Sequence, residues 1–335
     1  MKPKILITGA SGFIGSHLVE EAVRQGFDVY AGVRKSSSKA YLTNNSIHIQ
    51  ELDLSSREDL GRIFSEISKT GNGFQYVIHN AGITYARKGE EFQTVNFEYT
   101  KNLVEALQDS RTDLKKFVLI SSLATQGPGN DKTMDPILLS NNPQPISSYA
   151  KSKLQAEQFL KTVVSLPYLI VKPTAVYGPR DKDFLQFIKL VKRGMEPYIG
   201  SHRQMISMLY VKDLSRAVIG LLGTSAVHRS YLISDRKSYD KQDLGATLKS
   251  MLSRRTFKVV VPLAALRWTI LAVEKIYGLA GTIPFLNVEK LNEISQGNWL
   301  CDSSEVWQDL SSAPEYDLEK GMKETVSWYM ENGWL

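Results

Sequence analysis

The sequence contains a single cysteine, Cys301, among its 335 residues. One cysteine cannot form a disulfide within the chain or supply a cysteine-based zinc site, and this composition is typical of proteins in a reducing compartment. The five histidines are scattered, with no spacing typical of metal ligands, so no metal site is expected. The first predicted strand follows Met1 to Lys4 directly, without room for a secretory leader, which favours a cytoplasmic location.

Dense runs of lysine and arginine are also missing. The chain carries 41 Lys+Arg against 35 Asp+Glu, a formal net charge of +6, and no basic stripe interleaved with aromatic residues. Nucleic acid is therefore not an expected partner, and an anionic cofactor or a solvated surface accounts equally well for the mild positive excess. With 42% hydrophobic residues the chain can bury a large core, in one large domain or in two connected lobes.

A glycine-rich stretch near the N-terminus carries the first functional signal. Residues 5–15 read I-L-I-T-G-A-S-G-F-I-G, an apolar run followed by spaced glycines and then by a helical pattern. A strand, a glycine turn and a helix N-terminus together bind phosphate, because backbone N–H groups approach a pyrophosphate closely and the helix dipole favours negative charge. The alternative is a turn that merely links strand to helix. The residues expected to contact a dinucleotide are Gly9, Ser11, Gly12, Phe13, Ile14 and Gly15.

The end of the second predicted strand, residues 28–33, bears on the choice of cofactor. A carboxylate at this strand end would accept hydrogen bonds from the adenosine ribose hydroxyls of NAD. The chain instead has Arg34 and Lys35 here and no acid, which favours the 2′-phosphate of NADP, with NAD as the alternative. Both cations could also be ordinary solvated loop charges.

Strand and helix patterns alternate through the first half of the chain. Further strands are predicted at 47–54, 76–79 and 117–121, each followed by a helical pattern or loop. This alternation predicts an α/β fold of the Rossmann type, a doubly wound parallel sheet with helices on both faces. Ligand-facing residues are expected where strands end, namely Asp53, Leu54, Asn80, Ala81 and Gly82. The Asp53 carboxylate would either reach the adenine amino group or only cap the next helix.

Tyr149 and Lys153 lie four residues apart in a helical pattern that opens at Ser148, so they share one helix face. A phenol has a pKa of about 10 and needs a nearby cation to act as an acid or base at neutral pH, and Lys153 can supply it. Ser122, at the end of the preceding predicted strand, could hydrogen-bond the substrate oxygen. Such a triad moves one proton while a nicotinamide moves one hydride. A chance Tyr and Lys on a solvated helix face is the alternative.

Together these motifs resemble the short-chain dehydrogenases/reductases, specifically the extended branch, or NAD-dependent epimerase/dehydratase superfamily, which includes 3β-hydroxysteroid-dehydrogenase-like enzymes. The resemblance covers essentially the whole chain through T-G-A-S-G-F-I-G from Thr8, H-N-A-G from His79, V-N at Val95, I-S-S-L-A-T-Q-G from Ile120, Y-A-K-S-K from Tyr149 and K-P-T-A-V-Y-G-P-R from Lys172. It implies that Ser122, Tyr149 and Lys153 are catalytic. It places Asn96 in the active-site framework, where a purely structural role is equally open. It also places Pro173 and Val176 in the nicotinamide pocket.

Departures from the family pattern bear on the substrate. Nucleotide-sugar members usually have an asparagine where this chain has Ala175, and an arginine for the diphosphate where it has Ile206. Without that arginine a charge-assisted pair worth about 1.5 to 3 kcal/mol is lost, which disfavours sugar nucleotides unless Arg180 or Arg203 takes its place. Dehydratases of this branch have Asp-Glu directly after the catalytic hydroxyl residue. Leu123 and the alanine after it make 4,6-dehydration improbable here.

The second half of the chain is expected to form the substrate side. The predicted boundaries are a dinucleotide-binding domain at 1–178, with its sheet completed within 207–235, and a smaller, mostly helical lobe at 179–206 and 236–335. Within 207–235, Asp213 is expected to cap a helix.

Residues 259–286 are rich in Leu, Ala, Ile and Val, but charges and prolines interrupt them, so they do not read as a membrane span. An ordinary buried helix is favoured over an amphipathic lid that covers an apolar substrate and touches a membrane surface.

The sequence thus predicts an NADP-preferring oxidoreductase that interconverts a secondary alcohol and a ketone on a small, modestly apolar molecule. One alternative is an NAD-dependent sugar-nucleotide epimerase that uses the same triad. An alternative of another class is a non-catalytic NADP sensor that acts through a protein partner. A homodimer is expected on family resemblance alone.

Overall fold

The computed structural model describes the chain except residues 1, 70–72, 111–112, 201 and 280–285, and except the side chains of 275–276 and 278–279. Its centre is a seven-stranded sheet in the order β11-β6-β5-β4-β1-β2-β3, in which every neighbouring pair is parallel. The strands are β1 (Lys4–Thr8), β2 (Asp28–Val33), β3 (Ile47–Glu51), β4 (Tyr76–His79), β5 (Lys116–Ile120), β6 (Tyr168–Pro173) and β11 (Arg229–Ile233). The predicted Rossmann-type α/β fold is confirmed.

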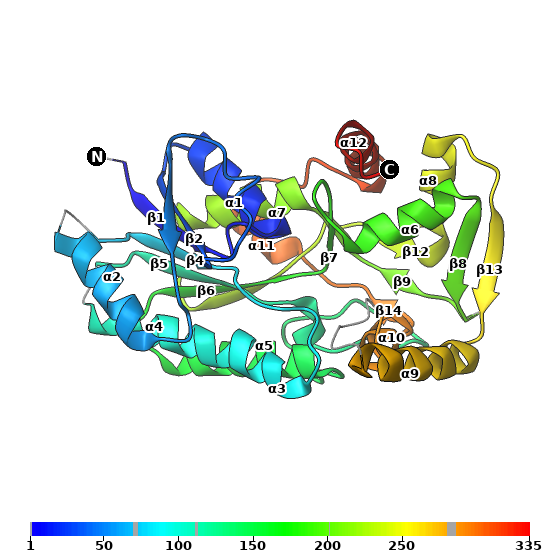
Figure 1. Cartoon of the computed structure of the whole chain (residues 1–335), viewed down its shortest axis with the longest axis horizontal. Coiled ribbons are helices and arrows are strands. Elements are labelled where there is room, and N and C mark those ends of the chain that lie inside the picture. The colour runs from blue at the N-terminus through cyan, green and yellow to red at the C-terminus, as the bar shows by residue number, and fades with distance from the viewer. Residues whose placement is uncertain (1, 70–72, 111–112, 201, 280–285) are drawn as a thin grey trace.

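Helices cover both faces of this sheet (Figure 1). Those on one face are α1 (Phe13–Arg24), α7 (Val211–Leu222) and α11 (Ser304–Asp309), and those on the other are α2 (Arg57–Lys69), α4 (Tyr99–Asp109) and α5 (Ser148–Thr162). Every residue of β5 and β6 is buried. A parallel strand covered on both faces favours a continuous apolar run, which is why the sequence predicted β5 from such a run, whereas β6 was not among the predicted strands.

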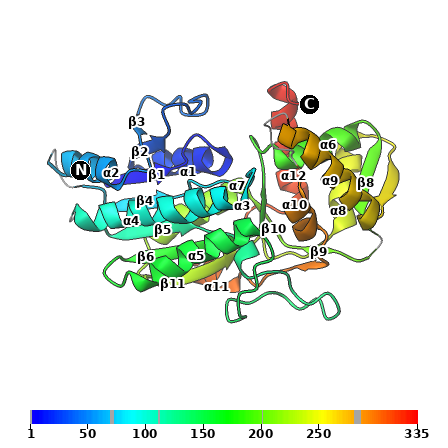
Figure 2. The ribbon, with the colours of Figure 1, turned by 60° about the horizontal axis from the view of Figure 1, so that its bottom comes forward.

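The remaining elements form a second body beside the C-terminal ends of the strands (Figure 2). Its helices are α6 (Asp183–Lys192), α8 (Lys241–Leu252), α9 (Leu263–Leu279), α10 (Val288–Ile294) and α12 (Leu318–Glu331). Its short strands are β7 (Ala175–Tyr177) with β10 (Met208–Tyr210), β8 (Met195–Ile199) with β13 (Phe257–Val261), and β9 (Met205–Ile206) between β12 (Tyr239–Asp240) and β14 (Asn298–Trp299). Apolar side chains of α6, α8 and α12 share one core with Tyr177 and Tyr210.

One predicted helix is divided in the structure. The helical region around Val95 consists of α3 (Gly89–Phe92), a π-helical turn η1 (Gln93–Glu98) and then α4. A short 3-10 turn, η2 (Leu123–Thr125), follows β5. Wide π-helical turns often occur at functional sites because they displace one side chain from the regular helix. Here the turn contains the buried Asn96.

The favoured interpretation of residues 259–286 as a buried helix is wrong. The segment forms the end of β13 and then α9, and among the described side chains of α9 only Ile270 is buried. Residues 280–285 lie outside the described part. Within the described chain, no helix is long and apolar enough to cross a membrane.

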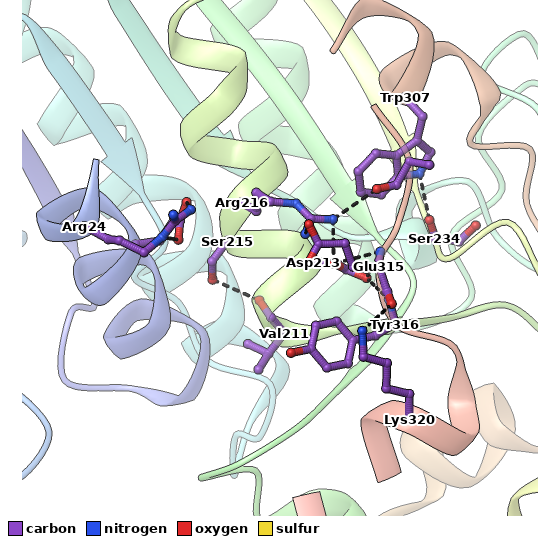
Figure 3. Close-up of polar contacts among 12 residues, drawn as sticks. Arg24, Val211, Asp213, Ser215, Arg216, Ser234, Trp307, Glu315, Tyr316 and Lys320 are labelled. Atoms are coloured by element: carbon purple, nitrogen blue, oxygen red, sulfur yellow. Dashed lines mark hydrogen bonds and ion pairs between the residues drawn. The ribbon is translucent and has the colours of Figure 1, made fainter. Parts of the chain in front are cut away.

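Asp213 also differs from its predicted role as a helix cap. Tyr210 is the N-cap of α7, and the fully buried Asp213 carboxylate accepts hydrogen bonds from the backbone N–H groups of Glu315, at 3.0 Å, and Tyr316, at 2.9 Å. Arg216, one turn along α7, donates to the same carboxylate at 2.8 Å (Figure 3). Asp213 therefore anchors the segment that leads into α12.

Candidate active site

A cavity of about 1980 Å³ runs past the C-terminal ends of the central strands and on between the two bodies. Single-ligand pockets are usually about 300 to 1,000 Å³, so this one has room for a dinucleotide and a substrate together. The predicted site residues on its wall are Gly9, Ser11, Gly12, Phe13, Ile14, Arg34, Lys35, Asp53, Leu54, Asn80, Ala81, Gly82, Asn96, Ser122, Tyr149, Lys153, Pro173 and Val176. Gly15 is the one predicted site residue that the structure does not bring to this wall.

The glycine loop fits a pyrophosphate. Gly9 has φ of +65°, and a Cβ added there would lie 2.9 Å from the Ala81 backbone. Gly12 is the N-cap of α1 and offers no side-chain oxygen to the first N–H groups of the helix, which are thus available to an anion. Gly15 lies behind the loop, where a Cβ would come within 2.0 Å of the Gly9 carbonyl oxygen. Its role is close packing of helix against loop.

The two cations predicted to select the cofactor are exposed at the cavity wall. Neither Arg34 nor Lys35 forms an ion pair with another described residue. Asp53, nearby on the same wall, does not cap α2, because Ser56 Oγ accepts the backbone hydrogen bond from Asp59, at 3.1 Å. The Asp53 carboxylate accepts bonds from the side chain and backbone of Ser55, which lower its pKa and keep it ionised.

A buried network shapes the turn after β4. Thr8 Oγ1 accepts from the backbone N–H groups of Asn80 and Ala81, at 3.2 and 3.1 Å, and bonds His79 Nδ1 at 2.8 Å. His79 Nε2 bonds Thr100 Oγ1 at 2.9 Å. Burial lowers the pKa of His79 to about 3, so the ring is neutral at physiological pH. The histidine therefore serves as a structural support of the cavity wall and not as a proton carrier.

The triad residues meet at the end of β5. The half-buried Tyr149 phenol lies beside the Ser122 side chain, and Lys153 Nζ donates to the Ile120 carbonyl oxygen at 2.6 Å. Burial raises the pKa of Tyr149 to about 12; the bond to Ser122 opposes this rise and the charge of Glu293 adds to it. The expectation that Lys153 lowers this pKa is not met here, because its ammonium bonds the backbone of β5. Burial lowers the pKa of Lys153 to about 8.

Asn96 forms hydrogen bonds that support the structural role left open in the sequence analysis. Its Oδ1 accepts from the backbone N–H of Ile83 at 2.8 Å, and its Nδ2 donates to the Ile83 carbonyl and to Ser152 Oγ, both at 3.1 Å. It thereby ties the loop after β4 to α5, the helix that carries Tyr149. A Cβ at Gly82 would lie 2.9 Å from Asn96 Oδ1, so a side chain there would press on the group that accepts from Ile83.

Sequence reasoning missed Glu157, the next residue on the Tyr149–Lys153 face of α5. Its fully buried carboxylate accepts from Ser121 Oγ at 2.5 Å and lies 2.7 Å from Lys172 Nζ of β6. Its charge also opposes the fall in the pKa of Lys153. The spacing of four residues from Lys153 was a signal that could have revealed it.

Two further carboxylates come from α10. Glu289 accepts from the backbone N–H and the hydroxyl of Ser148, at 3.0 and 2.6 Å, and Glu293 accepts from Ser147 Oγ. Both therefore sit at the N-terminus of α5, the helix that carries Tyr149, where the helix dipole favours negative charge. They lie about 140 residues from α5 in the chain, so no local sequence pattern could predict their contact with the start of this helix.

The far end of the cavity has few polar groups at the family's sugar-nucleotide positions. Ala175 and Ile206 both line it. Arg180 also reaches it; it donates to Glu20 at 2.5 Å and stacks over the Tyr41 ring, while its Nε and Nη1 are buried without a hydrogen-bond partner among the described residues. Arg203 is exposed and does not line the cavity.

The chain matches several proteins of known name over nearly its whole length. A ceramide reductase of Caulobacter vibrioides is 25% identical, covering 99% of this chain and 96% of that protein, and a UDP-glucose 4-epimerase of Vibrio cholerae is 24% identical, covering 99% and 97%. The crystal structure of UDP-glucose 4-epimerase from Thermotoga maritima with UDP-glucose superposes with a TM-score of 0.80 at 23% identity, covering 98% and 99% of the two chains.

The family model that matches describes the NAD dependent epimerase/dehydratase family, and it spans residues 5–234. That range contains the glycine loop, the triad and, apart from Lys4 at the start of β1, all seven strands of the central sheet. The chain therefore belongs to the NAD-dependent epimerase/dehydratase family of enzymes, in the extended branch of the short-chain dehydrogenases/reductases.

Proposed function

We propose that this enzyme is an NADP-linked oxidoreductase that interconverts a ketone and a secondary alcohol on an apolar substrate. The observation that carries the proposal is that Ala175 and Ile206 take the positions of sugar-nucleotide contacts at the substrate end, where charged side chains such as Arg180, Asp183 and Lys290 also line the wall. Aromatic side chains on the same cavity wall are Phe184, Phe187, Tyr198 and Trp299. Such a surface favours apolar ligands held by a few polar groups. The name of the ceramide reductase relative, which refers to a lipid, agrees with this substrate class.

The protonation state of Tyr149 is the one that ketone reduction requires. With its pKa raised to about 12, the Tyr149 phenol carries its proton at neutral pH and can donate it to the carbonyl oxygen of the substrate. Ser122 Oγ orients that oxygen. Lys153 bonds the Ile120 carbonyl in the structure, and in the proposed reaction its ammonium, with a pKa of about 8, turns to the phenolate that remains. A nicotinamide dinucleotide, when bound along the glycine loop, supplies the hydride. Alcohol oxidation uses the same groups in reverse.

A sugar-nucleotide epimerase is the second candidate, favoured by the unpaired Arg180 nitrogens in the cavity wall and by the epimerase relatives. The nucleotide released when the purified protein is denatured separates the two functions. An epimerase returns the hydride to the same substrate and keeps its NAD, so near-stoichiometric NAD(H) in the mass spectrum would contradict our proposal. An empty protein, or one that releases exchangeable NADP(H), would support it.

Replacing Tyr149 by phenylalanine removes the proposed acid. We expect NADPH-dependent reduction of the best substrate in a panel of apolar ketones to fall by roughly 10²- to 10⁴-fold, the usual contribution of a general acid. NADP(H) affinity should be nearly unchanged in a fluorescence titration. Tyr99→Phe, which alters another phenol on the cavity wall, is the control and should keep its activity. Unchanged turnover in Tyr149→Phe would refute the triad. A wild-type protein that binds NADP(H) but reduces no ketone and epimerises no sugar nucleotide would favour a sensor.

Cofactor choice has a test of its own. Arg34→Ala should raise the Kd for NADP roughly tenfold to a hundredfold, because one charge-assisted bond to the 2′-phosphate is lost. The Kd for NAD, which lacks that phosphate, should stay the same. Arg87→Ala, an exposed arginine away from the cavity wall, is the matched control. Equal NADP affinity in Arg34→Ala and wild type would mean that the cations at this strand end are only solvated charges.

A further inference from the structure

Helix α9 lies at the end of the molecule away from β3 (Figure 2), and many of its exposed side chains are apolar. We use the name α9 surface for a set of exposed apolar residues on this helix, namely Leu263, Ala264, Ala265, Trp268, Leu271 and Ala272. Trp268 is 75% exposed, and in the preceding strand Phe257 and Val260 are exposed by 61% and 53%. The solvent face of a helix in a globular protein is ordinarily polar or charged. A surface of this composition therefore indicates a partner outside the chain.

The chain segment that contains this apolar surface is basic. The stretch from Arg254 to Lys275 contains five Lys and Arg residues against one acid, so it contributes +4 of the net charge of +6 of the whole chain. Among its described side chains, Arg267 is exposed on α9 and Lys258 in β13, while Arg254 and Arg255 are exposed before the start of β13, at the end of that strand away from α9. The single acid, Glu274, is half-buried and accepts the backbone N–H of Val288 at 2.9 Å. The segment thus combines apolar anchors on α9 with an excess of positive charge in the chain that leads into and along the helix.

This combination fits an anionic lipid bilayer. A helix that lies in the membrane interface has an exposed apolar side with tryptophan and leucine, and lysine or arginine placed to meet lipid headgroups. With 17 residues, α9 is about 25 Å long, and within the described chain no helix qualifies as a membrane span. We propose that α9 docks this enzyme on the surface of an anionic membrane, lying in the interface plane.

The docking helix adjoins the substrate end of the cavity. Directly before α9, Val261 of β13 pairs with Ile199 of β8, which lines the cavity. At the other end of the helix, the bond from Val288 to Glu274 fixes the start of α10, which contributes Lys290 to the cavity wall. If the proposed function holds, a substrate dissolved in the bilayer would need to travel only a short way to the triad. Membrane docking itself does not depend on that chemistry.

Vesicle flotation with the full-length protein tests the proposal. The protein should float with vesicles of phosphatidylcholine mixed with phosphatidylglycerol, and much less with phosphatidylcholine alone. High salt should weaken binding, because screening reduces the attraction of the basic residues. Trp268→Glu should lower the vesicle affinity roughly tenfold or more, since it replaces the largest apolar anchor by a charge. Val164→Glu, at a valine that is 76% exposed at the C-terminal end of α5, is the matched control and should float like wild type.

Three results would overturn the proposal. The first is no flotation with either vesicle. The second is flotation that Trp268→Glu does not reduce. The third is a dimer in light scattering that Trp268→Glu converts to monomer while vesicles bind neither form, which would mean that a second copy of the chain covers the α9 surface. NADP(H) binding by the Trp268→Glu protein verifies its fold, and the ketone assay is scored separately, so failure of docking and failure of the proposed function remain distinguishable.

Discussion

At the scale of single residues, the buried carboxylate of Glu157 interacts with two lysines near the candidate site. Glu157 faces the ammonium of Lys172 directly and acts on Lys153 through its charge. Its bond to Ser121 also fixes the residue between the Ile120 carbonyl, which receives Lys153, and the triad residue Ser122. We therefore regard Glu157 as a positioning residue.

Replacing Glu157 by glutamine keeps a group that can bond Ser121 but removes the charge. Burial already brings the pKa of Lys153 down to about 8, and the charge of Glu157 opposes that fall. Without the charge the ammonium is lost at lower pH, so the alkaline limb of the kcat profile should move to lower pH. The free energy of unfolding should fall by about 3 kcal/mol, because Lys172 loses its buried counterion. Urea denaturation and a pH–rate profile measure the two effects.

The matched control is Glu58→Gln, an exposed glutamate in the first turn of α2. It should change neither the pH profile nor the urea midpoint. A Glu157→Gln enzyme that is less stable but has an unshifted alkaline limb would show that the carboxylate supports only the fold, and would contradict its action on Lys153.

At the scale of elements, the phosphate site depends on how closely α1 approaches the loop that precedes it. The contact between Gly15 and the Gly9 carbonyl leaves no space for a side chain, although Gly15 itself is not on the cavity wall. The dinucleotide site is thus created by the packing of an element as much as by the residues that would contact the ligand.

Gly15→Ala should move α1 away from the loop. We expect the free energy of unfolding to fall by about 1 to 3 kcal/mol, as for other overpacked sites, and the affinity for either dinucleotide to fall as well. Gly61→Ala is the control, because it lies in α2 and a Cβ there meets nothing within 4 Å. That change should leave binding intact and stabilise the protein by up to about 1 kcal/mol. Thermal unfolding with and without NADP(H) measures both variants, and equal behaviour would show that the contact at Gly15 is easily relieved.

At the scale of the whole molecule, the sequence was most informative where structure is local. The predicted bounds of β2 and β4 agree with the structure, and the triad residues lie together because helix spacing and strand order both follow from short-range patterns. Contacts between distant segments could not be read in this way. The carboxylate of Glu293 affects Tyr149 only because α10 packs on the start of α5.

The solvent exposure of α9 was the other property that could not be predicted from the sequence. A helix that is rich in apolar residues is usually buried in the core. The sequence shows that such side chains avoid water, but it does not show whether the same chain or another partner covers them. The prediction for α9 was wrong for this reason, since the described chain leaves Trp268 uncovered. The predicted limits of the dinucleotide-binding domain and the substrate lobe stay predictions.

The position of β11 at the edge of the sheet has a consequence for biosynthesis. Its partner β6 ends at Pro173 and β11 begins at Arg229, so 55 residues must be made between them. At roughly 5 to 20 residues per second, the outer edge of β6 stays without its partner for on the order of 3 to 11 seconds. An apolar strand edge left open for this long is a template for pairing with other chains. Translation speed through residues 174–228 therefore sets how long each new molecule is exposed to aggregation on the ribosome.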